Sequence, residues 1–218
     1  MADPDEEHDD GQMPAVIRQQ FWSRCYDGTS TYDLMEVTGL GKGSIYKAYG
    51  YKHELFLRTF RDYCEGLVAG ARKALLAEEA EPSPLKRIEG YLLTTTDQMI
   101  RQSPPLGCYL TKVTVDMAAI DEDVAQVAKR AYEEIAGAFE AAVREGQAVG
   151  EVDPAKDAKA LGHLMLVTIR GIDCLARSGL AAGVLADTAR AAISALRTSG
   201  DFGTDHITEP PVGIEPTT

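Results

Sequence analysis

Two short helices joined by a glycine-containing turn are predicted from residues 29–56, TSTYDLMEVTGLGKGSIYKAYGYKHELF. Leu34 and Val37 are three residues apart, so they fall on one face of the first helix. Ser30 or Thr31 can cap that helix, because a hydroxyl there accepts a backbone N–H that the first turn leaves unpaired. The stretch is therefore expected to begin with a capped amphipathic helix.

The second short helix has an inward face and an outward face. Ile45 and Tyr49 are four residues apart and are expected to face inward. Gly39 is expected to end the first helix, since glycine adopts at little cost the left-handed conformation in which a chain often leaves a helix. The outer or end surface of the second helix consists of Lys42, Gly43, Ser44, Tyr46, Lys47 and Ala48. Two helices joined by so short a turn form a helix-turn-helix unit, whose second helix enters the major groove of DNA.

The outward side chains suit contact with DNA. Lys42 and Lys47 offer cations to phosphates or guanine edges, and Ser44 and Tyr46 offer hydroxyl groups. Gly43 has no side chain, so it lets the backbone approach DNA closely. The pattern therefore predicts double-stranded DNA as a partner.

The same stretch resembles the DNA-binding domain of the TetR family of transcriptional regulators. It matches the pattern of that family at Thr29, Ser30, Asp33, Leu34, Thr38, Gly39, Leu40, Lys42, Gly43, Ser44, Ile45, Tyr46, Ala48, Tyr49, Lys52, Leu55 and Phe56. The expected DNA-binding residues are Thr29, Ser30, Lys42, Gly43, Ser44, Tyr46, Lys47, Ala48 and Lys52. The resemblance implies an all-α fold, in which an N-terminal three-helix helix-turn-helix domain precedes a C-terminal helical bundle that binds a ligand and dimerises.

Three positions depart from the family's pattern. Gly41 and Tyr51 stand where the second short helix and the helix after it usually have a capping residue, although glycine is a tolerable cap. Cys25 replaces a usual glycine, and a cysteine that keeps a positive φ there costs about 1 kcal/mol. These departures concern local stability and operator affinity rather than the fold.

Charge and composition divide the chain, whose net charge is −12, into four segments. Residues 1–13 carry six acidic and no basic side chains and are expected to be a disordered tail. Residues 14–62, the expected DNA-binding domain, carry seven basic and five acidic side chains. Residues 63–200 are the expected effector-binding and dimerisation domain, and the proline-rich residues 201–218 are a second expected disordered tail. The acidic total does not exclude DNA binding, because DNA responds to the field within a Debye length of about 8–10 Å.

Helical periodicity continues beyond the helix-turn-helix. Helices are predicted over residues 14–24, 52–76, 85–101, 108–120, 124–145, 155–178 and 181–196. No segment alternates polar and apolar residues in the manner of a half-buried strand. The predicted fold is therefore all-α, with about nine helices.

The last two predicted helices carry long faces of small and apolar residues. These are Ala160, Leu161, Leu164, Thr168, Gly171, Leu175, Leu185, Thr188, Ala192 and Leu196. Two such helices from each of two chains can form a four-helix interface, and a homodimer places two recognition helices about 34 Å apart on a palindromic operator. The alternative is that these faces close the core of a monomer.

The resemblance also implies a ligand cavity that the fifth, sixth, seventh and eighth helices enclose. Its expected ligand-binding residues are Tyr91, Thr95, Met99, Tyr109, Thr114, Met117, Tyr132, Phe139, His163 and Asp173. Each of them is more often a core residue than a ligand contact, because such residues at helical spacing fill most bundles. His163 and Asp173 suggest a polar or cationic handle on an otherwise unidentified small-molecule effector.

Cys108 lies where a helix is predicted to begin, and a helix N-terminus favours the reactive thiolate form of cysteine. It is therefore a possible sensor of oxidants or electrophiles, against the alternative of a buried small hydrophobic residue. Cys64 and Cys174 are expected in the core. The four cysteines form no C-x-x-C pair, so neither a structural metal site nor a cofactor is predicted.

The sequence shows no nucleophile elbow, phosphate loop or metal-ligand spacing, so an enzyme is not expected. It has neither an apolar run of about 18 residues nor an N-terminal apolar signal core, so a cytoplasmic protein is expected. The predicted function is that of a homodimeric repressor that a small molecule releases from its operator. The alternative is a repressor that senses redox state or electrophiles through the thiol of Cys108.

Overall fold

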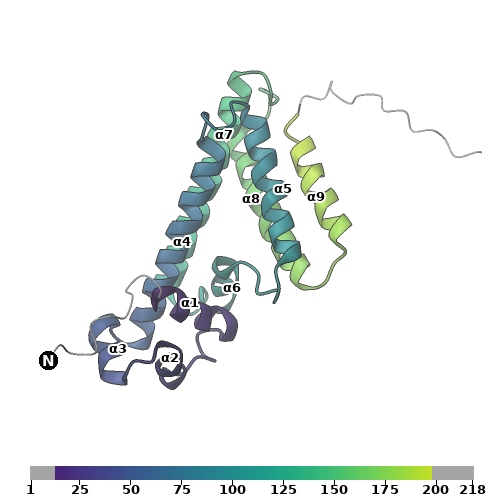
Figure 1. Ribbon diagram of the computed structural model, residues 1–218. Helices are drawn as coiled ribbons and strands as arrows, with labels where there is room; N and C mark the ends of the chain where they lie inside the picture. The colour runs from purple at the N-terminus through teal and green to yellow at the C-terminus, as the bar shows by residue number, and fades with distance from the viewer. Residues whose placement is uncertain (1–12, 198–218) are drawn as a thin grey trace, which may run out of the picture.

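The computed structural model describes residues 13–197, which form nine α-helices and no strand (Figure 1). The helices are α1 (Met13–Arg24), α2 (Thr31–Thr38), α3 (Lys42–Tyr49), α4 (Lys52–Leu76), α5 (Pro84–Arg101), α6 (Tyr109–Met117), α7 (Glu122–Ala148), α8 (Ala158–Arg177) and α9 (Ala182–Ser194). The all-α prediction is therefore confirmed. The two expected tails lie outside the described residues, apart from Met13, which begins α1 and so does not belong to the acidic tail.

Helices α1, α2 and α3 pack with the first turns of α4 into a small head at one end of the molecule (Figure 1). The core of the head consists of residues that are at most 1% exposed. They are Ile17, Phe21, Leu34, Ile45, Leu55 and Phe56. The predicted inward position of Val37 is wrong, because this side chain is 37% exposed. The buried face of α2 consists instead of Leu34 and Thr38, four residues apart, and this turns Val37 toward solvent.

The ends of α2 follow the expected cap chemistry. Ser30 is the N-cap: its hydroxyl accepts the N–H of Asp33 at 3.1 Å, and the Asp33 carboxylate accepts the N–H of Ser30 at 2.7 Å. Gly39 adopts φ 69° and donates its N–H to the carbonyl of Met35 at 2.9 Å. Cys25 has φ 61°, so the site does keep the left-handed backbone that costs a cysteine about 1 kcal/mol.

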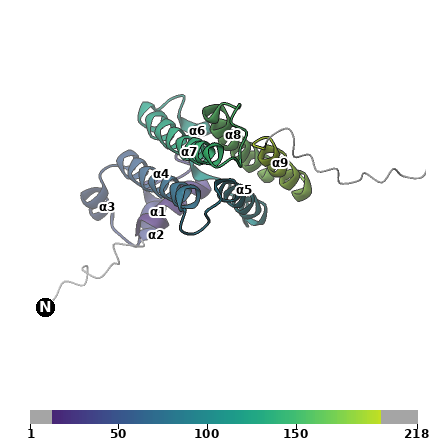
Figure 2. The same cartoon turned by 90° about the horizontal axis from the view of Figure 1, so that it is seen from above.

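Helix α4 joins the head to a bundle of α5, α6, α7, α8 and α9 (Figures 1 and 2). It packs along α7, which in turn packs along α8, while α5 contacts α7, α8 and α9. Gly162 lets α7 and α8 approach closely, because a Cβ atom at this position would lie 2.9 Å from the Ala136 carbonyl oxygen. The core between these helices includes Val68, Ala71, Ala131, Ile135, Phe139, Met165 and Leu166.

Several helix ends differ from the predicted ones. Helix α6 ends at Met117 instead of residue 120, and α9 ends at Ser194 instead of residue 196. Helix α8 begins at Ala158 instead of residue 155, because the Asp157 carboxylate accepts the N–H of Lys159 at 2.9 Å and caps the helix there. Such ends depend on individual caps, which apolar periodicity does not report.

Candidate functional site

The outer face of α3 brings together most of the residues that the sequence assigned to DNA contact. Five of them are exposed, namely Lys42, Gly43, Ser44, Lys47 and Ala48. Ile45, only 1% exposed, holds the helix against the head. Among the described residues neither lysine of α3 forms an ion pair, so no carboxylate neutralises either cation.

Tyr46 ties α3 to its neighbours. Its hydroxyl lies 3.3 Å from the Thr31 hydroxyl at the start of α2, and Lys42 Nζ lies 5.5 Å from its ring centroid. The ring of Tyr51 packs on that of Tyr46 with centroids 5.4 Å apart, while 72% of Tyr51 is exposed. Tyr51 is thus a further candidate for DNA contact. In the sequence Tyr51 stands out only as an unusual helix cap. Helical periodicity relates residues within one helix, so it does not predict a contact between Tyr46 and Tyr51 across a turn.

Three other predicted DNA-binding residues have partners inside the head. The prediction for Thr29 is wrong, because this residue is 0% exposed and its hydroxyl donates to the Cys25 carbonyl at 2.8 Å. Ser30 is exposed, but its hydroxyl caps α2. Lys52 is half-buried and places Nζ 4.1 Å from the Tyr26 ring centroid, a cation–π contact that draws it toward α1.

Three directional contacts join the head to the bundle. Trp22 Nε1 of α1 donates to the Gly107 carbonyl at 3.1 Å, and Lys112 Nζ of α6 donates to the Trp22 carbonyl at 2.6 Å. His53 Nε2, near the start of α4, lies 2.7 Å from an Asp121 oxygen at the start of α7. A cavity of about 370 Å³ lies at this junction, and its lining is Cys25, Tyr26, Asp27, His53, Asp116, Met117, Ile120 and Asp121.

The carboxylate of Asp121 is shared between two contacts. Burial acts to raise its pKa, but the hydrogen bonds from His53 and from the N–H of Val124 outweigh burial, and the pKa is lowered overall. One oxygen accepts the Val124 N–H at 3.1 Å and so caps α7, while the other contacts His53. Its charged form therefore stabilises both the start of α7 and the junction with the head.

The predicted ligand-binding residues do not form one cavity. Thr114, Tyr132 and His163 line a pocket of about 340 Å³ between α6, α7 and α8, where the hydroxyls of Thr114 and Tyr132 lie 3.4 Å apart. Met117 lines the junction cavity instead. Thr95 and Met99 are half-buried on α5 and line none of the cavities described here.

The remaining members of that set pack in the core or against it and line none of these three cavities. Tyr109 is 0% exposed and lies in an aromatic cluster, with its ring centroid 5.6 Å from that of Trp22 and 5.8 Å from that of Phe60. Tyr91 and Phe139 pack edge to face with centroids 5.5 Å apart. Asp173 is 1% exposed: one of its oxygens accepts the backbone N–H of Cys108 at 2.9 Å, and the other lies 3.9 Å from Arg177 Nη2.

A cavity of about 440 Å³ forms a groove between α4 and α7 that the sequence did not predict. Its lining is Arg61, Cys64, Glu65, Val68, Ala69, Arg72, Asp123, Gln126, Val127, Arg130, Ala131 and Glu134. Charged residues alternate there with apolar ones, and in a sequence this pattern is typical of a solvated helix face. Only the pairing of two long helices shows that the apolar members form the floor of a groove.

Cys108 immediately precedes α6 and is 8% exposed. Arg170 Nη1 of α8 donates to its sulfur at 2.8 Å, and the Tyr63 hydroxyl lies 3.7 Å from the same sulfur. The expected burial of Cys64 is confirmed, at 3% exposed, whereas that of Cys174 is wrong, because this residue is exposed. The Cys108 sulfur therefore accepts a hydrogen bond from a cationic side chain, which a purely apolar environment would not supply.

The faces predicted to form a dimer divide into buried and exposed residues. Leu161 of α8 and both Leu185 and Leu196, in α9 and just after it, are buried, so they close the core of the monomer. Besides Lys159 and His163 near its start, the exposed part of α8 has a spacing of three to four residues and consists of Ala160, Leu164, Val167, Gly171, Cys174 and Leu175. The α8 surface is therefore apolar and uncovered within the described chain.

Within residues 13–197 no helix is long and apolar enough to cross a membrane. The same residues contain no group of three or more His, Cys, Asp or Glu side chains that could hold a metal ion.

Comparison with known proteins gives consistent matches. Residues 84–195 match the family model of the tetracyclin repressor-like C-terminal domain. The HTH-type transcriptional repressor ComR of Escherichia coli K12 is 24% identical over 159 residues, which are 73% of this chain and 75% of ComR. A cysteine-substituted variant of the TetR family regulator CifR, solved with a 26-base-pair operator, is 21% identical, covers 89% of this chain and all of its own, and superimposes with a TM-score of 0.76. Reduced E. coli NemR is 15% identical, covers 86% of this chain and 96% of its own, and gives a TM-score of 0.75.

The junction carboxylate gives a test by pH. We expect Asp121→Ala to lower the free energy of unfolding at pH 7 by about 1 kcal/mol, the size of a helix cap, because it removes both contacts of the carboxylate. The lowered pKa means that this stabilisation is present above the unfolded pKa, about 3.9, and is lost as pH falls through the folded value. The difference between wild type and variant should therefore shrink from pH 7 to pH 3 in urea unfolding at fixed protein concentration.

The matched control is Asp187→Ala, which removes an exposed carboxylate that pairs only with Arg190. It should change stability by less than about 0.5 kcal/mol at either pH. A difference for Asp121→Ala that stays constant down to pH 3 would show that the carboxylate's charge does not matter.

Proposed function

The chain belongs to the TetR family of transcriptional regulators, and from this premise we propose that it is a homodimeric repressor that a small-molecule effector releases from its operator DNA. The observation that carries the proposal is the outer face of α3. There, two unpaired lysines, one hydroxyl and a glycine lie exposed on a helix that the head holds firmly in place. Such a face fits the major groove, where lysine and hydroxyl groups meet phosphates and base edges.

Local charge supports the same proposal. Residues 14–62 carry seven basic and five acidic side chains, although the whole chain carries −12. The head therefore presents a modest positive field, and the acidic remainder opposes unspecific binding to nucleic acid. Operator affinity should fall steeply with salt, because each neutralised phosphate releases counterions.

The exposed face of α8 supports the homodimer. Leu164, Val167 and Leu175 are 40%, 65% and 45% exposed, an arrangement of apolar surface that a second copy of the same face can cover. Val184 of α9, 51% exposed, extends this surface. Two-fold symmetry then presents two α3 helices to a palindromic operator, as the reading of adjacent half-sites requires.

Helix α4 supports a route from effector to DNA. It borders the 440 Å³ groove in the bundle, and its first turns belong to the head. A molecule that separates α4 from α7 would therefore rotate the head and change the distance between the recognition helices of the dimer. A coupling free energy of about 1–3 kcal/mol between the two sites is enough for such a switch.

A second candidate function is thiol-based sensing of an oxidant or electrophile. The contact of 2.8 Å between Arg170 and the Cys108 sulfur favours it, because a guanidinium stabilises the thiolate that reacts. The solved structure of NemR, a relative in fold, is described as a reduced form. Both candidates share the same DNA-reading head and differ only in the signal.

DNA binding is tested with Lys47→Ala. In fluorescence anisotropy, the wild type should prefer the duplex that flanks its own gene over random duplex, and the variant should bind about tenfold more weakly, the loss of one charged contact. The slope of log affinity against log salt should fall by about 1. The control is Lys86→Ala, which removes an exposed lysine of α5 and should leave both the affinity and the salt slope unchanged. Equal binding of both duplexes by the ligand-free wild type would contradict the proposal.

Dimerisation is tested with Val167→Glu on α8. A carboxylate buried in an apolar interface is costly, so sedimentation should show a monomer where the wild type sediments as a dimer. Val115→Glu is the matched control, since Val115 is 77% exposed but lies on α6; it should remain dimeric. A dimeric Val167→Glu variant would place the interface on another surface.

The two candidate signals are separated with Cys108→Ser. If the thiol is the sensor, a hydroperoxide should release the wild type from its operator and leave the variant bound. Cys174→Ser, which alters the exposed cysteine, should still be released. Equal release of wild type and Cys108→Ser would reject sensing by this thiol, and release of neither would favour the small-molecule effector.

A further inference from the structure

We propose that Cys64 and Cys108 form an intramolecular disulfide when the protein meets a hydroperoxide, and that this bond changes the junction between the bundle and the DNA-reading head. The proposal rests on the second candidate function, since it assigns to that sensor a second, resolving cysteine on α4. It also gives a reason why a buried thiol can control a distant DNA-binding surface.

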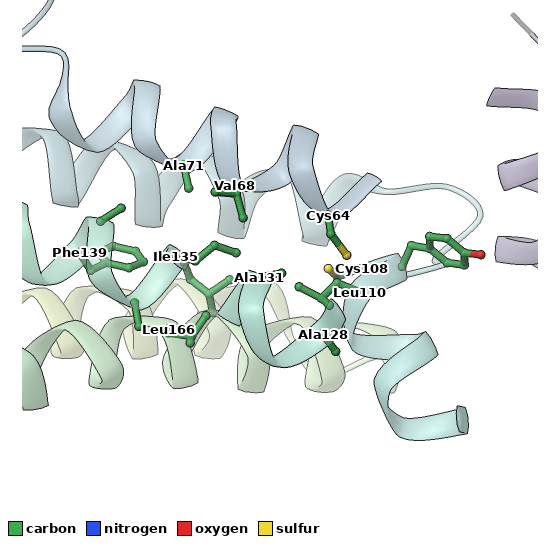
Figure 3. Packing of buried hydrophobic residues seen from close by; sticks show 14 of the residues in the cluster. Cys64, Val68, Ala71, Cys108, Leu110, Ala128, Ala131, Ile135, Phe139 and Leu166 are labelled. Atoms are coloured by element: carbon green, nitrogen blue, oxygen red, sulfur yellow. The ribbon is translucent and has the colours of Figure 1, made fainter. Parts of the chain in front are cut away.

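The two cysteines come from different elements and meet in the core. Cys64 belongs to α4 and Cys108 to the connection just before α6, and they are 3% and 8% exposed. Figure 3 shows their side chains turned toward each other between these two elements. Burial first, and then a Coulombic contribution from Cys108, raise the pKa of Cys64 to about 12.

The surroundings give the two thiols different roles. Arg170 Nη1 donates a hydrogen bond to the Cys108 sulfur at 2.8 Å, whereas burial raises the pKa of the Cys64 thiol to about 12, so Cys64 remains protonated. Cys64 also lines the 440 Å³ groove between α4 and α7, so a small oxidant that enters the groove reaches the Cys64 side of the pair. Cys108 is therefore the sulfur that attacks first, and Cys64 the one that resolves the product.

The chemistry balances with a hydroperoxide as the only co-reactant. The Cys108 thiolate attacks the terminal oxygen of the peroxide; the O–O bond breaks, the alkoxide or hydroxide leaves and takes up a proton, and a sulfenic acid remains. The Cys64 sulfur then attacks the sulfur of that sulfenic acid, the S–O bond breaks, and the hydroxide leaves as water with the Cys64 proton. Two thiols and one peroxide thus give one disulfide, one water, and one alcohol or second water.

The bond acts on contacts that join the head to the bundle. A disulfide requires Cα atoms about 4.4–6.8 Å apart, and it removes the free sulfur to which Arg170 donates. Cys108 also donates its N–H to Asp173 at 2.9 Å, and its neighbour Gly107 accepts the indole N–H of Trp22 at 3.1 Å. Drawing Cys108 toward α4 therefore pulls on α8 through Asp173 and on α1 through Trp22.

The experiment is disulfide mapping of the full-length protein after treatment with hydrogen peroxide, alkylation of free thiols and non-reducing tryptic digestion. Cleavage after Arg61 and Arg72 and after Arg101 and Lys112 places Cys64 in peptide 62–72 and Cys108 in peptide 102–112. We expect one linked species of these two peptides that disappears on reduction. In Cys64→Ser this species should vanish, and labelling of Cys108 by dimedone should rise severalfold, because the sulfenic acid is no longer resolved.

Cys174→Ser is the matched control and should leave the linked species unchanged. Cys64→Ala replaces Cys64→Ser if circular dichroism shows that a hydroxyl in this core prevents folding. The proposal is overturned if oxidised wild type contains Cys108 as sulfinic acid with no linked species, or if Cys108 is linked to Cys174 of a second chain. Operator binding is measured on the same samples, so that a mapped bond without DNA release contradicts only the sensor function, and release without the bond contradicts only the role of Cys64.

Discussion

The apolar stripe of α4 is the constraint on which both halves of the molecule depend. Phe56 and Phe60 at its start are buried in or next to the head, and Val68 and Leu75 further along are buried in the bundle. A helix of 25 residues spans about 37 Å, so one rigid element carries both cores. Because neither core can release its part of the stripe without exposing apolar surface, movement of the bundle against α4 becomes a rotation of the head.

Apolar burial alone does not fix the orientation of the head, because it has no direction. The directional contacts at the junction are few: Trp22 with Gly107 and Lys112, and His53 with Asp121. A small number of hydrogen bonds worth about 0.5–1.5 kcal/mol each can be broken by a ligand or a chemical modification without unfolding either core. The junction is thus the place where a modest free-energy change can alter the DNA-reading geometry.

The parts of the fold that the sequence predicts are those set by local chemistry. The turn at Gly39, the cap at Ser30 and the left-handed backbone at Cys25 depend on residues only a few positions away, and all three have the expected form. The ligand-binding residues depend on which helix faces which. Periodicity places Tyr109 and Phe139 on inward faces but does not say whether a partner ring or a cavity lies opposite.

The same limit applies to single residues in the head. Thr29 matches the family's pattern, yet its hydroxyl bonds to the preceding turn, whereas Tyr51 departs from that pattern and lies exposed beside α3. A match in sequence therefore shows that a residue is needed by the fold, by the DNA contact or by both. Only the direction of the side chain separates these roles.

The interior beside Cys108 contains buried polar atoms without hydrogen-bond partners. Arg170 Nε and Asp173 Oδ2 are buried without a hydrogen-bond partner there, and each unsatisfied group costs about 1–3 kcal/mol. Apolar side chains in the same place would be more stable. The present arrangement therefore favours any state of the protein that supplies a new hydrogen-bond acceptor or donor to these two atoms. The Cys108 sulfur accepts a hydrogen bond from the guanidinium of Arg170, and the backbone N–H of this residue donates one to Asp173. Cys174, in contrast, lies exposed on α8. A chemical change at Cys108 therefore alters the balance of buried charge beside the head, and the same change at Cys174 does not.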